Sequence, residues 1–587
     1  MNKIFFIALV SSALVMTSCI EETFPTSIAI ESQLESSPTA IEAMVSAIPT
    51  AMIGWENNLL ERCGYPGLCV AFEEMTTDVV IAGTNGYNTW GTYSRMHNPL
   101  HNRQLYSWYM HYAFVRNANN VIGLIDKDTQ DETMRSYLGI AYAYRALYYL
   151  NMVRMFEYKY TQYCKPATDA LYGLGVPVIT EETTEAEAKN NPRATVEKNY
   201  EMIFDDLQKA ETYLTGYTPP SKAYPTKACV YGLFARAYLE RGTAGITGAY
   251  EKAAEYARKA INESGCTPLT QSQWEDPVNG FNNATSQNSW MWGILVSTDN
   301  TSLAIGPYGS FYGLMVMEQT WTVYGWGVGR ALSRKTYEAI PDNDFRKYSW
   351  LDPVFFDNIK SDGTVVWTGQ DSYNGHTYKL AMPADVLRGN VSGNKGWFLG
   401  YPYLYLPIKF RPYDNNYATA STGAAMDFPL MRVEEMYLIE AEAKAHTNFG
   451  EGKNLLNTFM SYRITDGSYD CSTKCTDTQS LVDEIIFQKR VEFWGEGINY
   501  FDAKRLQLGL HRGYKGINAA NYNTTFDLDG IFPQWNCRIP EAEQQGNPAI
   551  ILNPIPDNAI SLDIHWAKDN TILQQYYGCD LDNPDGN

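Results

Sequence analysis

The sequence predicts a mostly α-helical protein in which paired helices form a scaffold and a long, loop-rich insertion carries an exposed surface. Three observations lead to this prediction: several segments place apolar residues at helical spacing, alanines recur on their apolar faces, and one long stretch between them lacks a sustained helical period. The chain has 587 residues, enough for a large core, and 14% of them are aromatic. So many rings need a use beyond the core, and neutral amphipathic ligands such as sugars are one.

The N-terminus has the pattern of a secretion signal. Lys3 precedes an apolar run that ends in "LVMTSC", and the run is shorter than the roughly 20 residues that a helix needs to span a bilayer. This ending is similar to a bacterial lipobox, in which the cysteine takes a diacylglyceryl group and becomes the new N-terminus. We therefore predict a lipoprotein signal peptide at residues 1–18, lipidation at Cys19 and a lipidated tether at 19–35. An ordinary cysteine beside a signal peptide is the alternative.

The charge of the chain disfavours several classes of ligand. The formal net charge is −20, and removal of residues 1–18 takes away only the one charge of Lys3, which leaves −21. No cluster of lysines and arginines offers the basic footprint that nucleic acid requires, so we expect no nucleic-acid partner. The same acidic field disfavours sulfated or uronic-acid-rich ligands. The sequence has no P-loop, HExxH or GxSxG motif, and we predict no cofactor.

Residues 36–264 are predicted to form an N-terminal helical part with tetratricopeptide-like repeats. Its strongest helical pattern covers residues 132–157, where two faces are apolar, so this helix must be covered around most of its circumference. We assign Tyr137, Tyr144 and Tyr148 of this helix to the core. Further helices, whose alanine-rich faces allow the close approach of stacked pairs, are expected near 36–62 and at 195–214, 226–241 and 249–263.

Residues 265–425 are predicted to be a loop-rich insertion. Glycine, asparagine, aspartate, tryptophan and tyrosine dominate it, and only 332–340 has a short helical pattern. Loops of this length in a compact protein are usually functional, so the ligand-binding face is expected here. Residues 426–587 are predicted to form a C-terminal helical repeat and an irregular tail, with helices at 427–447, 451–464 and 478–508.

The acidic residues in the helix expected at 427–447 suit ion pairs of the scaffold. Glu440 precedes Lys444 by one helical turn, which is the favourable order, and Arg432 can reach Glu435. We therefore interpret these acids as solvated or structural ion pairs rather than as catalysts.

The chain has ten cysteines, so lipidation of Cys19 leaves an odd number and at least one unpaired thiol. Two close pairs, Cys63 with Cys69 and Cys471 with Cys475, lie in loop-like sequence and could form disulfides in an oxidising compartment. The histidines lack the spacing of zinc ligands, and we predict no metal site, although the acidic ending "DLDNPDGN" leaves calcium binding open. The connectivity stays open among Cys63, Cys69, Cys164, Cys229, Cys266, Cys471, Cys475, Cys537 and Cys579.

Several stretches, spread over most of the chain, follow one another in a characteristic order. They are "YRALYYLNMVRMFE" with "GLGVPVITEET", "NPRATVEKNYEMIFDDLQKAETYL", "YPTKACVYGLFARAYLERG" with "AYEKAAEYARKAI", "FPLMRVEEMYLIEAEAKA", "IIFQKRVEFWGEGINYFDAKRL" and "NPIPDNAI". Any one alone would be a generic helix, but together they resemble the SusD/RagB family of Bacteroidetes outer-membrane lipoproteins. The sequence departs from the family pattern at Ile498 and Asn499, where an arginine is common, and in its last residues, which run past the usual asparagine-rich ending.

The resemblance implies a SusD-like fold, with four tetratricopeptide-like helix pairs as scaffold and the insertion as ligand face. It implies a binding protein rather than an enzyme: a glycan-binding lipoprotein of the outer membrane, facing the cell exterior, that captures neutral oligo- or polysaccharide and delivers it to a SusC-like TonB-dependent transporter. Contact with the membrane is expected through the N-terminal lipid only. Some relatives deliver peptides, so a peptide-binding protein of the same uptake system is the alternative.

Aromatic residues among glycines and asparagines are the candidate ligand contacts, because sugars present flat apolar faces with hydroxyl edges. They lie in "GTNGYNTWGTYSR", which follows the first helices, and in "GPYGSFYG" and "TWTVYGWGVGR" of the insertion. Their positions resemble the aromatic arc of the family, but each ring could instead pack a loop onto the scaffold. We predict Trp90, Tyr308 and Trp326 as the main contacts, with Tyr87, Tyr312 and Trp321 as further candidates.

A surface glycoside hydrolase is the less favoured alternative. It would need two carboxylates about 5 to 9.5 Å apart on opposite sides of the sugar. We predict no catalytic residue, because the only support for any acid is its closeness in the sequence to candidate rings. The acids that meet this criterion are Glu73, Glu74, Asp78, Glu275 and Asp276.

Overall fold

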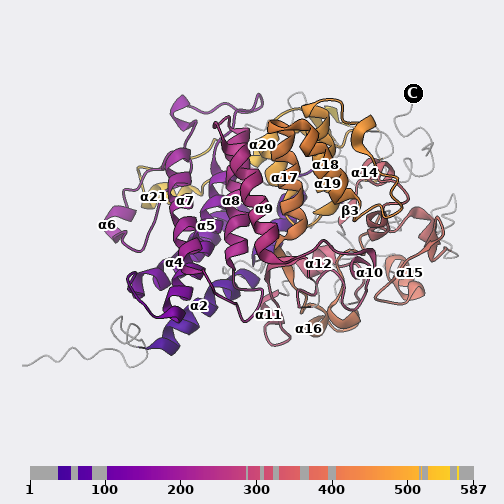
Figure 1. Ribbon diagram of the computed structural model, residues 1–587, viewed down its shortest axis with the longest axis horizontal. Coiled ribbons are helices and arrows are strands. Elements are labelled where there is room, and N and C mark those ends of the chain that lie inside the picture. The colour runs from indigo at the N-terminus through magenta and orange to yellow at the C-terminus, as the bar shows by residue number, and fades with distance from the viewer. Residues whose placement is uncertain are drawn as a thin grey trace, which may run out of the picture.

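The structure, a computed structural model, describes residues 37–54, 64–81, 102–285, 288–304, 310–320, 330–356, 369–393, 405–514, 517–518, 526–554 and 565–566. Helices dominate this part and the strands are short, so the prediction of a mostly α-helical fold is confirmed (Figure 1). The α-helices are α2 (Pro38–Ile53), α3 (Gly64–Glu73), α4 (Asn102–Leu124), α5 (Glu132–Phe156), α6 (Glu185–Ala188), α7 (Val196–Tyr213), α8 (Lys227–Thr243), α9 (Ala249–Ser264), α10 (Gln271–Trp274), α11 (Thr301–Ala304), α12 (Phe311–Met315), α14 (Arg334–Ala339), α15 (Ala384–Gly393), α16 (Ala420–Gly423), α17 (Val433–Thr447), α18 (Phe449–Met460), α19 (Thr478–Glu492), α20 (Asn499–Leu506) and α21 (Glu541–Gly546). The strands are β1 (Val79–Ile81), β2 (Trp290–Ile294), β3 (Arg330–Leu332), β4 (Ser372–Tyr373), β5 (His376–Thr377), β6 (Phe428–Arg432), β7 (Leu510–His511), β8 (Phe526–Leu528) and β9 (His565–Trp566).

The long helices form an array in which each helix packs against the next. α4 packs on α5, α5 on α7, α7 on α8 and α8 on α9, and α9 packs on α17, which contacts α18 and α19. Figure 1 shows α5, α7, α8, α9 and α17 side by side. Because α9 and α17 precede and follow residues 265–425 in the sequence, the array continues directly across the insertion. The grouping into four tetratricopeptide-like pairs stays a prediction.

Helix α5 confirms the strongest helical prediction and explains its two apolar faces. The Asp131 carboxylate caps its first turn by accepting a backbone N–H hydrogen bond of 2.9 Å. From Leu138 onward nearly every residue is buried, because α2, α4, α7 and α8 all pack against this helix. Tyr144 and Tyr148 lie in the core as predicted, whereas Tyr137 near the start of the helix is only partly buried.

Two predicted helices of the C-terminal part have the wrong bounds. The helix expected at 427–447 begins only at Val433, because the residues before it form β6 and pair antiparallel with β2. Every residue of both strands is buried, so no alternation of polar and apolar residues marked β6 as a strand. The helix expected at 478–508 is interrupted between α19 and α20 by Gly495 and Gly497, whose φ angles of +82° and +79° a helix does not allow.

The elements of the insertion are short, as its composition indicates. The helix expected at 332–340 is observed as α14, while α15 is a helix that the sequence reading did not identify. Side chains of these segments form a small core of their own, which contains Leu351, Phe355 and Leu387. The insertion is therefore a layer of short elements with its own packing, and Figure 1 shows it beside the lower ends of the long helices.

Two sequence motifs far apart in the chain meet at the end of α5. The Arg193 guanidinium donates to the Gly175 carbonyl (2.6 Å), the Phe156 carbonyl (2.7 Å) and the Asn553 side-chain oxygen (2.8 Å). Asn553 in turn donates to the same Phe156 carbonyl at 2.9 Å. Arg193 and Asn553 thus satisfy the last carbonyl of the helix and attach the C-terminal segment to the scaffold.

Two acids of α17 form ion pairs with neighbouring helices of the array rather than with the next turn of their own helix. Glu440 of α17 accepts a hydrogen bond from Arg258 of α9 (2.9 Å) instead of pairing with Lys444. Glu435 pairs with Arg236 of α8 at 2.6 Å and not with Arg432. The structural role assigned to these acids is confirmed, but both predicted partners are wrong, because the helices lie close enough for longer side chains to cross between them.

A buried ionic network attaches the insertion to the helical scaffold. The Glu492 carboxylate at the end of α19 accepts two hydrogen bonds of 2.8 Å from Arg463, one of 3.1 Å from Arg346 and one of 3.1 Å from Arg432. All four side chains are at most 1% exposed. Burial opposes ionisation of Glu492, but the guanidinium groups of Arg463, Arg432 and Arg346 outweigh it and hold the pKa of the carboxyl well below its usual range.

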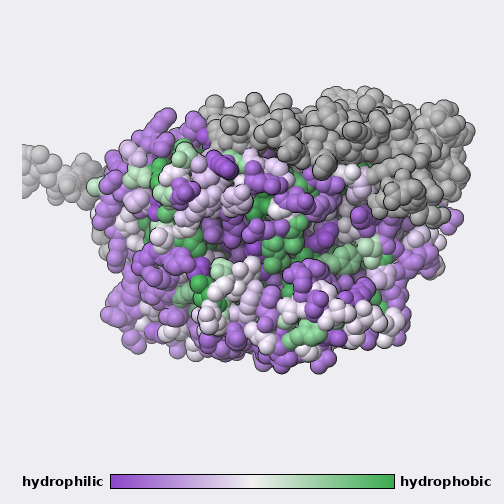
Figure 2. Space-filling view, turned by 90° about the horizontal axis from the view of Figure 1, so that it is seen from above, coloured by the Kyte–Doolittle hydropathy of each residue, from purple (hydrophilic) through white to green (hydrophobic). Residues whose placement is uncertain are grey.

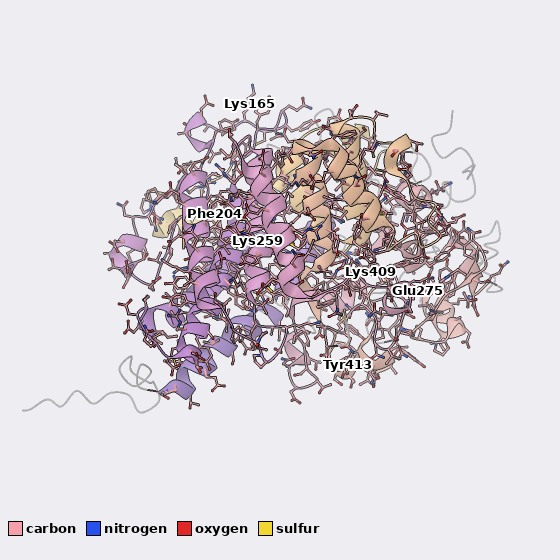
Figure 3. The ribbon with its side chains drawn as sticks, in the orientation of Figure 1. Lys165, Phe204, Lys259, Glu275, Lys409 and Tyr413 are labelled. Atoms are coloured by element: carbon pink, nitrogen blue, oxygen red, sulfur yellow. The ribbon has the colours of Figure 1, made fainter. Side chains whose placement is uncertain are left out.

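Lys409 extends this network from the insertion. Its ammonium donates to the Glu492 carbonyl (2.8 Å), the Trp494 carbonyl (2.9 Å) and the Glu496 carboxylate (2.7 Å). Glu496 also binds the Arg432 guanidinium at 2.9 Å. Figure 3 labels Lys409 where the insertion meets the helices of the C-terminal part. One residue of the insertion therefore satisfies the last carbonyl of α19 and a carbonyl just beyond the helix.

Among the described residues, Cys69, Cys229, Cys266, Cys471, Cys475 and Cys537 are free thiols. The disulfide considered for Cys471 and Cys475 is therefore not present in the structure, where both thiols are buried in a hydrophobic cluster shared by α17, α18 and α19. Cys69 is likewise unbonded, and Cys63 lies outside the described residues.

We expect the substitution Glu492→Gln to lower the free energy of unfolding by about 3–5 kcal/mol at pH 7, because it removes the carboxylate that three buried guanidinium groups share. The measurement is chemical denaturation, with Glu251→Gln on the exposed surface of α9 as control. The pKa of Glu492 is lower in the folded than in the unfolded protein. Its contribution to the free energy of unfolding is therefore complete above about pH 4.3 and falls at lower pH, so the difference in stability between wild type and variant should shrink there. A loss below about 1 kcal/mol at pH 7 would contradict the network's role.

A second prediction concerns Glu73, which is fully buried. Burial raises the pKa of this carboxyl to about 8, although the Gly497 N–H donates to it at 2.9 Å. An acid with a raised folded pKa contributes its stability below its unfolded pKa of about 4.3 and loses it as pH rises towards the folded value. Glu73→Gln resembles the protonated carboxyl and should remove this loss.

The expected result for Glu73→Gln is therefore that the stability of the variant relative to wild type is greater at pH 8 than at pH 5, by an amount on the order of 2 kcal/mol. Denaturation curves at the two pH values measure it, again with Glu251→Gln as control. An equal difference at both pH values would mean that Glu73 is ionised in the folded protein throughout this range.

Candidate ligand-binding site

A short antiparallel ladder brings together the ends of two segments that carry predicted ligand contacts. β1 pairs with β3 in the register Val79↔Leu332, Val80↔Ala331 and Ile81↔Arg330. The chain continues into 82–101 directly after Ile81 and returns from 321–329 directly before Arg330. Because the strands are antiparallel, both segments start from the same end of the ladder. Residues about 250 positions apart in sequence are thus anchored at one place.

A buried ion pair fixes this end of the ladder. Arg330 and Glu74 are both fully buried, and the Arg330 Nε donates to the Glu74 carboxylate at 2.8 Å. The Arg512 guanidinium donates to the Glu74 carbonyl at 2.7 Å, which ties the segment after β7 to the same point. Side chains that are this buried and this well paired allow little movement, so the ladder is a rigid base for the segments that leave it.

The other ends of the predicted loops are also attached to the insertion. The Thr320 N–H, directly before 321–329, donates to the Tyr417 carbonyl at 2.9 Å. Ser310, directly after 305–309, caps α12 by accepting the Gly313 N–H at 3.1 Å. Each predicted aromatic segment therefore begins or ends at a backbone position that is held by hydrogen bonds.

Most of the predicted contact residues lie outside the described residues. Trp90 and Tyr87 belong to 82–101, Tyr308 belongs to 305–309, and Trp321 and Trp326 belong to 321–329. Their roles stay predictions. The same holds for Cys19, which lies within 1–36.

Tyr312 is the predicted contact that the structure does describe, and the prediction is wrong about its exposure. The side chain is 2% exposed and belongs to the main hydrophobic core. Its hydroxyl packs so closely on the backbone at Gly423 that a Cβ there would lie 2.7 Å away. The glycine-rich sequence around Tyr312 reflects close packing of α12, not an open turn, so this ring offers no surface for stacking.

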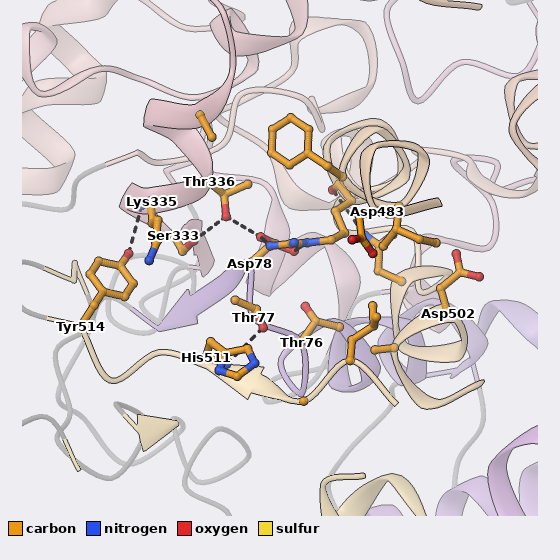
Figure 4. Close-up of a pocket in the computed structure, with 18 residues that line it drawn as sticks. Thr76, Thr77, Asp78, Ser333, Lys335, Thr336, Asp483, Asp502, His511 and Tyr514 are labelled. Atoms are coloured by element: carbon orange, nitrogen blue, oxygen red, sulfur yellow. Dashed lines mark hydrogen bonds and ion pairs between the residues drawn. The ribbon is translucent and has the colours of Figure 1, made fainter. Parts of the chain in front are cut away.

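A pocket lies at the opposite end of the ladder from the aromatic segments. Its walls come from residues 76–78 before β1, 333–339 after β3, 483–503 of α19 and α20, and 508–514 around β7, and its volume is about 470 Å³ (Figure 4). The first half of the chain, the insertion and the C-terminal helices all contribute to it. A volume of this size is within the range of small-molecule sites, roughly 300–1,000 Å³.

Asp78 is the central charged group of the pocket wall. Arg490 of α19 donates to both of its carboxylate oxygens, at 2.5 and 2.6 Å, and the Thr336 hydroxyl donates to it at 2.5 Å. The Ser333 hydroxyl lies 2.8 Å from the Thr336 hydroxyl and completes a chain of polar groups along the wall. Figure 4 shows Ser333, Thr336 and Asp78 joined in this chain along the wall.

Exposed side chains form the rim of the pocket. His511 is half exposed, and its backbone N–H donates to the Thr77 hydroxyl at 3.3 Å. The Lys335 N–H donates to the Tyr514 hydroxyl at 3.0 Å, and the Lys335 ammonium lies 5.6 Å from the Tyr514 ring centre. The rim therefore combines an imidazole, an ammonium and a phenol ring whose positions are fixed by the backbone.

The pocket has little uncompensated charge. Asp78 is neutralised by Arg490, and Asp502 by Lys489 and Arg505, each at 2.6 Å. Burial opposes ionisation of Asp502, but these two cations outweigh it and hold its pKa below the usual value. This electrostatic balance suits a neutral polar ligand better than an ion.

The acids that the hydrolase alternative would need have structural partners. Glu275 is buried and contacts the His376 Nε2 at 3.2 Å and the Lys379 ammonium at 3.1 Å. Burial lowers the pKa of His376, so at neutral pH this contact is a hydrogen bond from a neutral imidazole. Asp276 accepts the N–H groups of the two turn residues that follow it by two and three positions, at 2.8 and 3.0 Å.

Neither a metal cluster nor a membrane-spanning helix is found in the part of the chain that the structure describes. No group of three or more His, Cys, Asp or Glu side chains there is arranged to hold a metal ion. None of the helices within the described ranges combines the length and the apolar character needed to cross a membrane.

The view from above, in Figure 2, shows a mostly hydrophilic face where it is not covered by grey atoms. Hydrophobic residues appear on it as small separate areas rather than as one continuous patch.

Sequence reasoning missed most of the pocket. Asp78 was noted as an acid near candidate rings and Arg490 lies in the motif "IIFQKRVEF", but nothing connected them. The pairing depends on α19 packing beside β1, a contact between residues about 410 positions apart. A signal that could have drawn attention to Asp78 is its place between two threonines and the apolar run of β1, where a charged group directly precedes a strand.

Comparison with family models identifies two matching regions. A model described as starch-binding and associating with the outer membrane matches residues 64–239, and the SusD family model matches residues 274–577. Comparison with curated protein sequences gives no match.

Solved structures share the fold. A SusD-like carbohydrate binding protein from Bacteroides vulgatus ATCC 8482 is 20% identical, with a TM-score of 0.66, and the alignment covers 87% of this chain and 97% of that one. A SusD superfamily protein from Bacteroides thetaiotaomicron VPI-5482 is 19% identical, with a TM-score of 0.62 and coverage of 88% and 99%. A laminarin binding SusD-like protein is also 19% identical, with a TM-score of 0.58 and the same coverage. Because the SusD family model matches more than half of the sequence and the fold agrees, the chain belongs to the SusD family of carbohydrate-binding, outer-membrane-associated proteins.

Proposed function

We propose that this protein is a lipid-anchored, cell-surface lipoprotein that captures neutral oligo- or polysaccharide and delivers it to a SusC-like TonB-dependent transporter. The observation that carries the proposal is the β1–β3 ladder of a SusD-family fold, which anchors two segments rich in tryptophan and tyrosine at the same place. A laminarin-binding relative of the same fold supports carbohydrate as the ligand class.

Stacking on aromatic rings is the proposed means of capture. The flat apolar face of a sugar covers a ring, and hydroxyls at its edge bind to neighbouring polar groups. Trp90, Tyr308 and Trp326 are the proposed main contacts, with Tyr87 and Trp321 beside them. The net charge of −20 favours a neutral glycan, because an anionic polymer would be repelled.

The tether sets how far the domain can move from the membrane. Between the proposed lipid on Cys19 and the start of α2 at Pro38, a fully extended chain spans at most about 65 Å. The acyl chains anchor this end, each buried CH₂ contributing about 0.8 kcal/mol. A binding domain held this close to the outer membrane keeps its ligand at high local concentration beside a transporter.

Binding without catalysis fits the use of the acidic side chains. Glu74, Asp78 and Glu275 are buried and each is paired with a cation, so they serve the frame of the site. A hydrolase would need at least one carboxyl that faces the sugar and is held protonated. We therefore propose a non-enzymatic role.

A binding screen tests the proposed platform. The chain lacking residues 1–19 is screened by affinity electrophoresis and calorimetry against a panel of neutral polysaccharides, laminarin among them, and of peptides. For the glycan that binds, Trp90→Ala and Trp326→Ala should each weaken binding about five- to thirtyfold, because loss of one stacked ring removes about 1–2 kcal/mol.

Tyr160→Ala is the matched control, since Tyr160 is an exposed ring of the N-terminal helical part, outside the three aromatic segments in the sequence. It should bind like wild type. Unchanged glycan binding in both tryptophan variants would remove the platform. Binding of peptides alone would replace the glycan with a peptide, and turnover of the bound glycan would replace capture with catalysis.

The lipid anchor has its own test. Cys19→Ala should abolish incorporation of labelled fatty acid and release the protein from the outer-membrane fraction, because no other side chain at this point supplies a thiol for the lipid. Labelling of growing cells followed by membrane fractionation measures both effects. A Cys19→Ala protein that still carries label and sediments with the membrane would rule out this cysteine as the attachment point.

A further inference from the structure

We propose that the pocket at the far end of the β1–β3 ladder is a second carbohydrate subsite, which takes one or two sugar residues of a neutral glycan. The inference rests on the proposed function, because it adds a site of different construction for the same class of ligand. It concerns only described residues, and it is independent of the tryptophans proposed for the platform.

The pocket offers unused hydrogen-bonding groups. The Asp78 carboxylate accepts three hydrogen bonds, from Arg490 and Thr336, and a carboxylate has about four acceptor sites, so one remains. The Arg490 Nη1 group makes no hydrogen bond to any described residue, since only Nε and Nη2 bind Asp78. Sugar hydroxyls both donate and accept, and they match an acceptor beside a donor in this arrangement.

Asn499 provides an independent indication of a missing ligand. Its side chain is 3% exposed, it lines the pocket, and its Oδ1 atom has no hydrogen-bond partner within the described part of the chain. Its nitrogen makes only long contacts, 3.4 Å to the Arg490 carbonyl and 3.5 Å to Glu73. A buried amide oxygen without a partner is costly.

The walls are already in place for binding. Asp78 is held by three hydrogen bonds, and the Ser333 and Thr336 hydroxyls are bonded to each other, so these groups lose little freedom when a ligand binds. The Tyr514 and Phe487 rings add apolar surface on which a sugar face can rest. Such a combination of a few fixed polar groups with aromatic surface is typical of small-molecule sites.

The charge balance selects among ligands of this size. The carboxylates that line the pocket wall, Asp78 and Asp502, are each compensated by arginine or lysine. The lining also includes one further residue of each charge, Lys335 and Asp483. A free amino acid or peptide end carries a full charge and would need an uncompensated counter-charge, which this wall does not offer. A neutral sugar needs none.

The position of the pocket suits a glycan that also touches the aromatic segments. The ladder is three residue pairs long, and two steps of about 3.4 Å separate its ends by roughly 7 Å. The aromatic segments leave from the Ile81 end, and the pocket begins at the Val79 end. A glycan of a few sugar residues is long enough to contact both the pocket and the aromatic segments. Two weak contacts on one glycan molecule give a higher overall affinity than either contact alone.

Methyl NMR on the chain lacking residues 1–19 tests the subsite directly. Ile486, Leu508, Ala339 and Ala503 line the pocket and provide methyl signals there. The probes are maltose, cellobiose, laminaribiose, xylobiose, mannobiose and lactose, each raised to about 20 mM so that millimolar dissociation constants are detected. The dipeptide Ala-Ala serves as the charged comparison. We expect at least one disaccharide to shift the pocket methyls and Ala-Ala to leave them unchanged.

A blocking variant connects the shifts to the pocket. Ala339 is exposed at the rim, so Ala339→Trp fills the mouth without disturbing the core, and it should weaken the disaccharide at least about tenfold. Ala542→Trp, on the exposed side of α21, is the matched control and should bind like wild type. Thermal unfolding of both variants confirms that each is folded.

The outcomes separate this inference from the proposed function. If polysaccharide is captured but no disaccharide moves the pocket methyls and Ala339→Trp behaves like wild type, the subsite is overturned and the platform stands. If disaccharides move these methyls while no polysaccharide is captured, the subsite stands and the proposed capture role fails. Shifts caused by Ala-Ala alone overturn the carbohydrate assignment, and absence of binding by every saccharide overturns both proposals.

Discussion

The arrangement of this protein depends on one buried carboxylate and the arginines around it. Glu492 lies at the end of α19, and its partners come from β6, from the segment after α18 and from the insertion. Buried charges of this kind are tolerable only when every partner is in place, since a single unpaired guanidinium costs several kcal/mol. The network therefore acts as a condition on the fold: the insertion must lie where Arg346 reaches Glu492, and a displacement of a few ångströms would leave Arg346 with Asp344 alone as its carboxylate partner.

The network around Glu492 also determines the position of the candidate site. Arg490 and Glu492 are two residues apart on α19, so the same helical turn that holds the insertion also presents Arg490 to Asp78. Asp78 directly precedes β1, and β1 pairs with β3 of the insertion. Scaffold, ladder and pocket are thus parts of one rigid unit. Rigidity of this kind allows the segments that leave the ladder to differ in sequence without a cost to the scaffold.

The long helices were predictable because their signal is local. α5, α7, α8 and α9 begin and end within a few residues of the expected bounds, since helical spacing and small residues appear in one continuous stretch of sequence. The contacts that join segments far apart in the sequence could not be predicted. β6 is buried on both faces and looks like the start of a helix, Glu435 finds Arg236 rather than Arg432, and the glycines after α19 interrupt a pattern that is otherwise continuous. Tyr312 shows the same limit at the site, because glycine neighbours indicate either an exposed turn or close packing, and only tertiary contacts decide.

The two proposed ways of holding a glycan differ in their physics, and this difference matters for a protein that must also release its ligand. Stacking on rings is weakly directional and tolerates many sugars, whereas a pocket with fixed polar groups distinguishes one arrangement of hydroxyls from another. Neither needs to bind tightly, because two weak contacts on one chain raise the effective concentration at each site. When one of the two contacts is lost, the glycan dissociates quickly, because differences in affinity appear mostly as differences in dissociation rate. A rigid ladder only about 7 Å long between the two places makes such a combination geometrically possible for a chain of a few sugar residues.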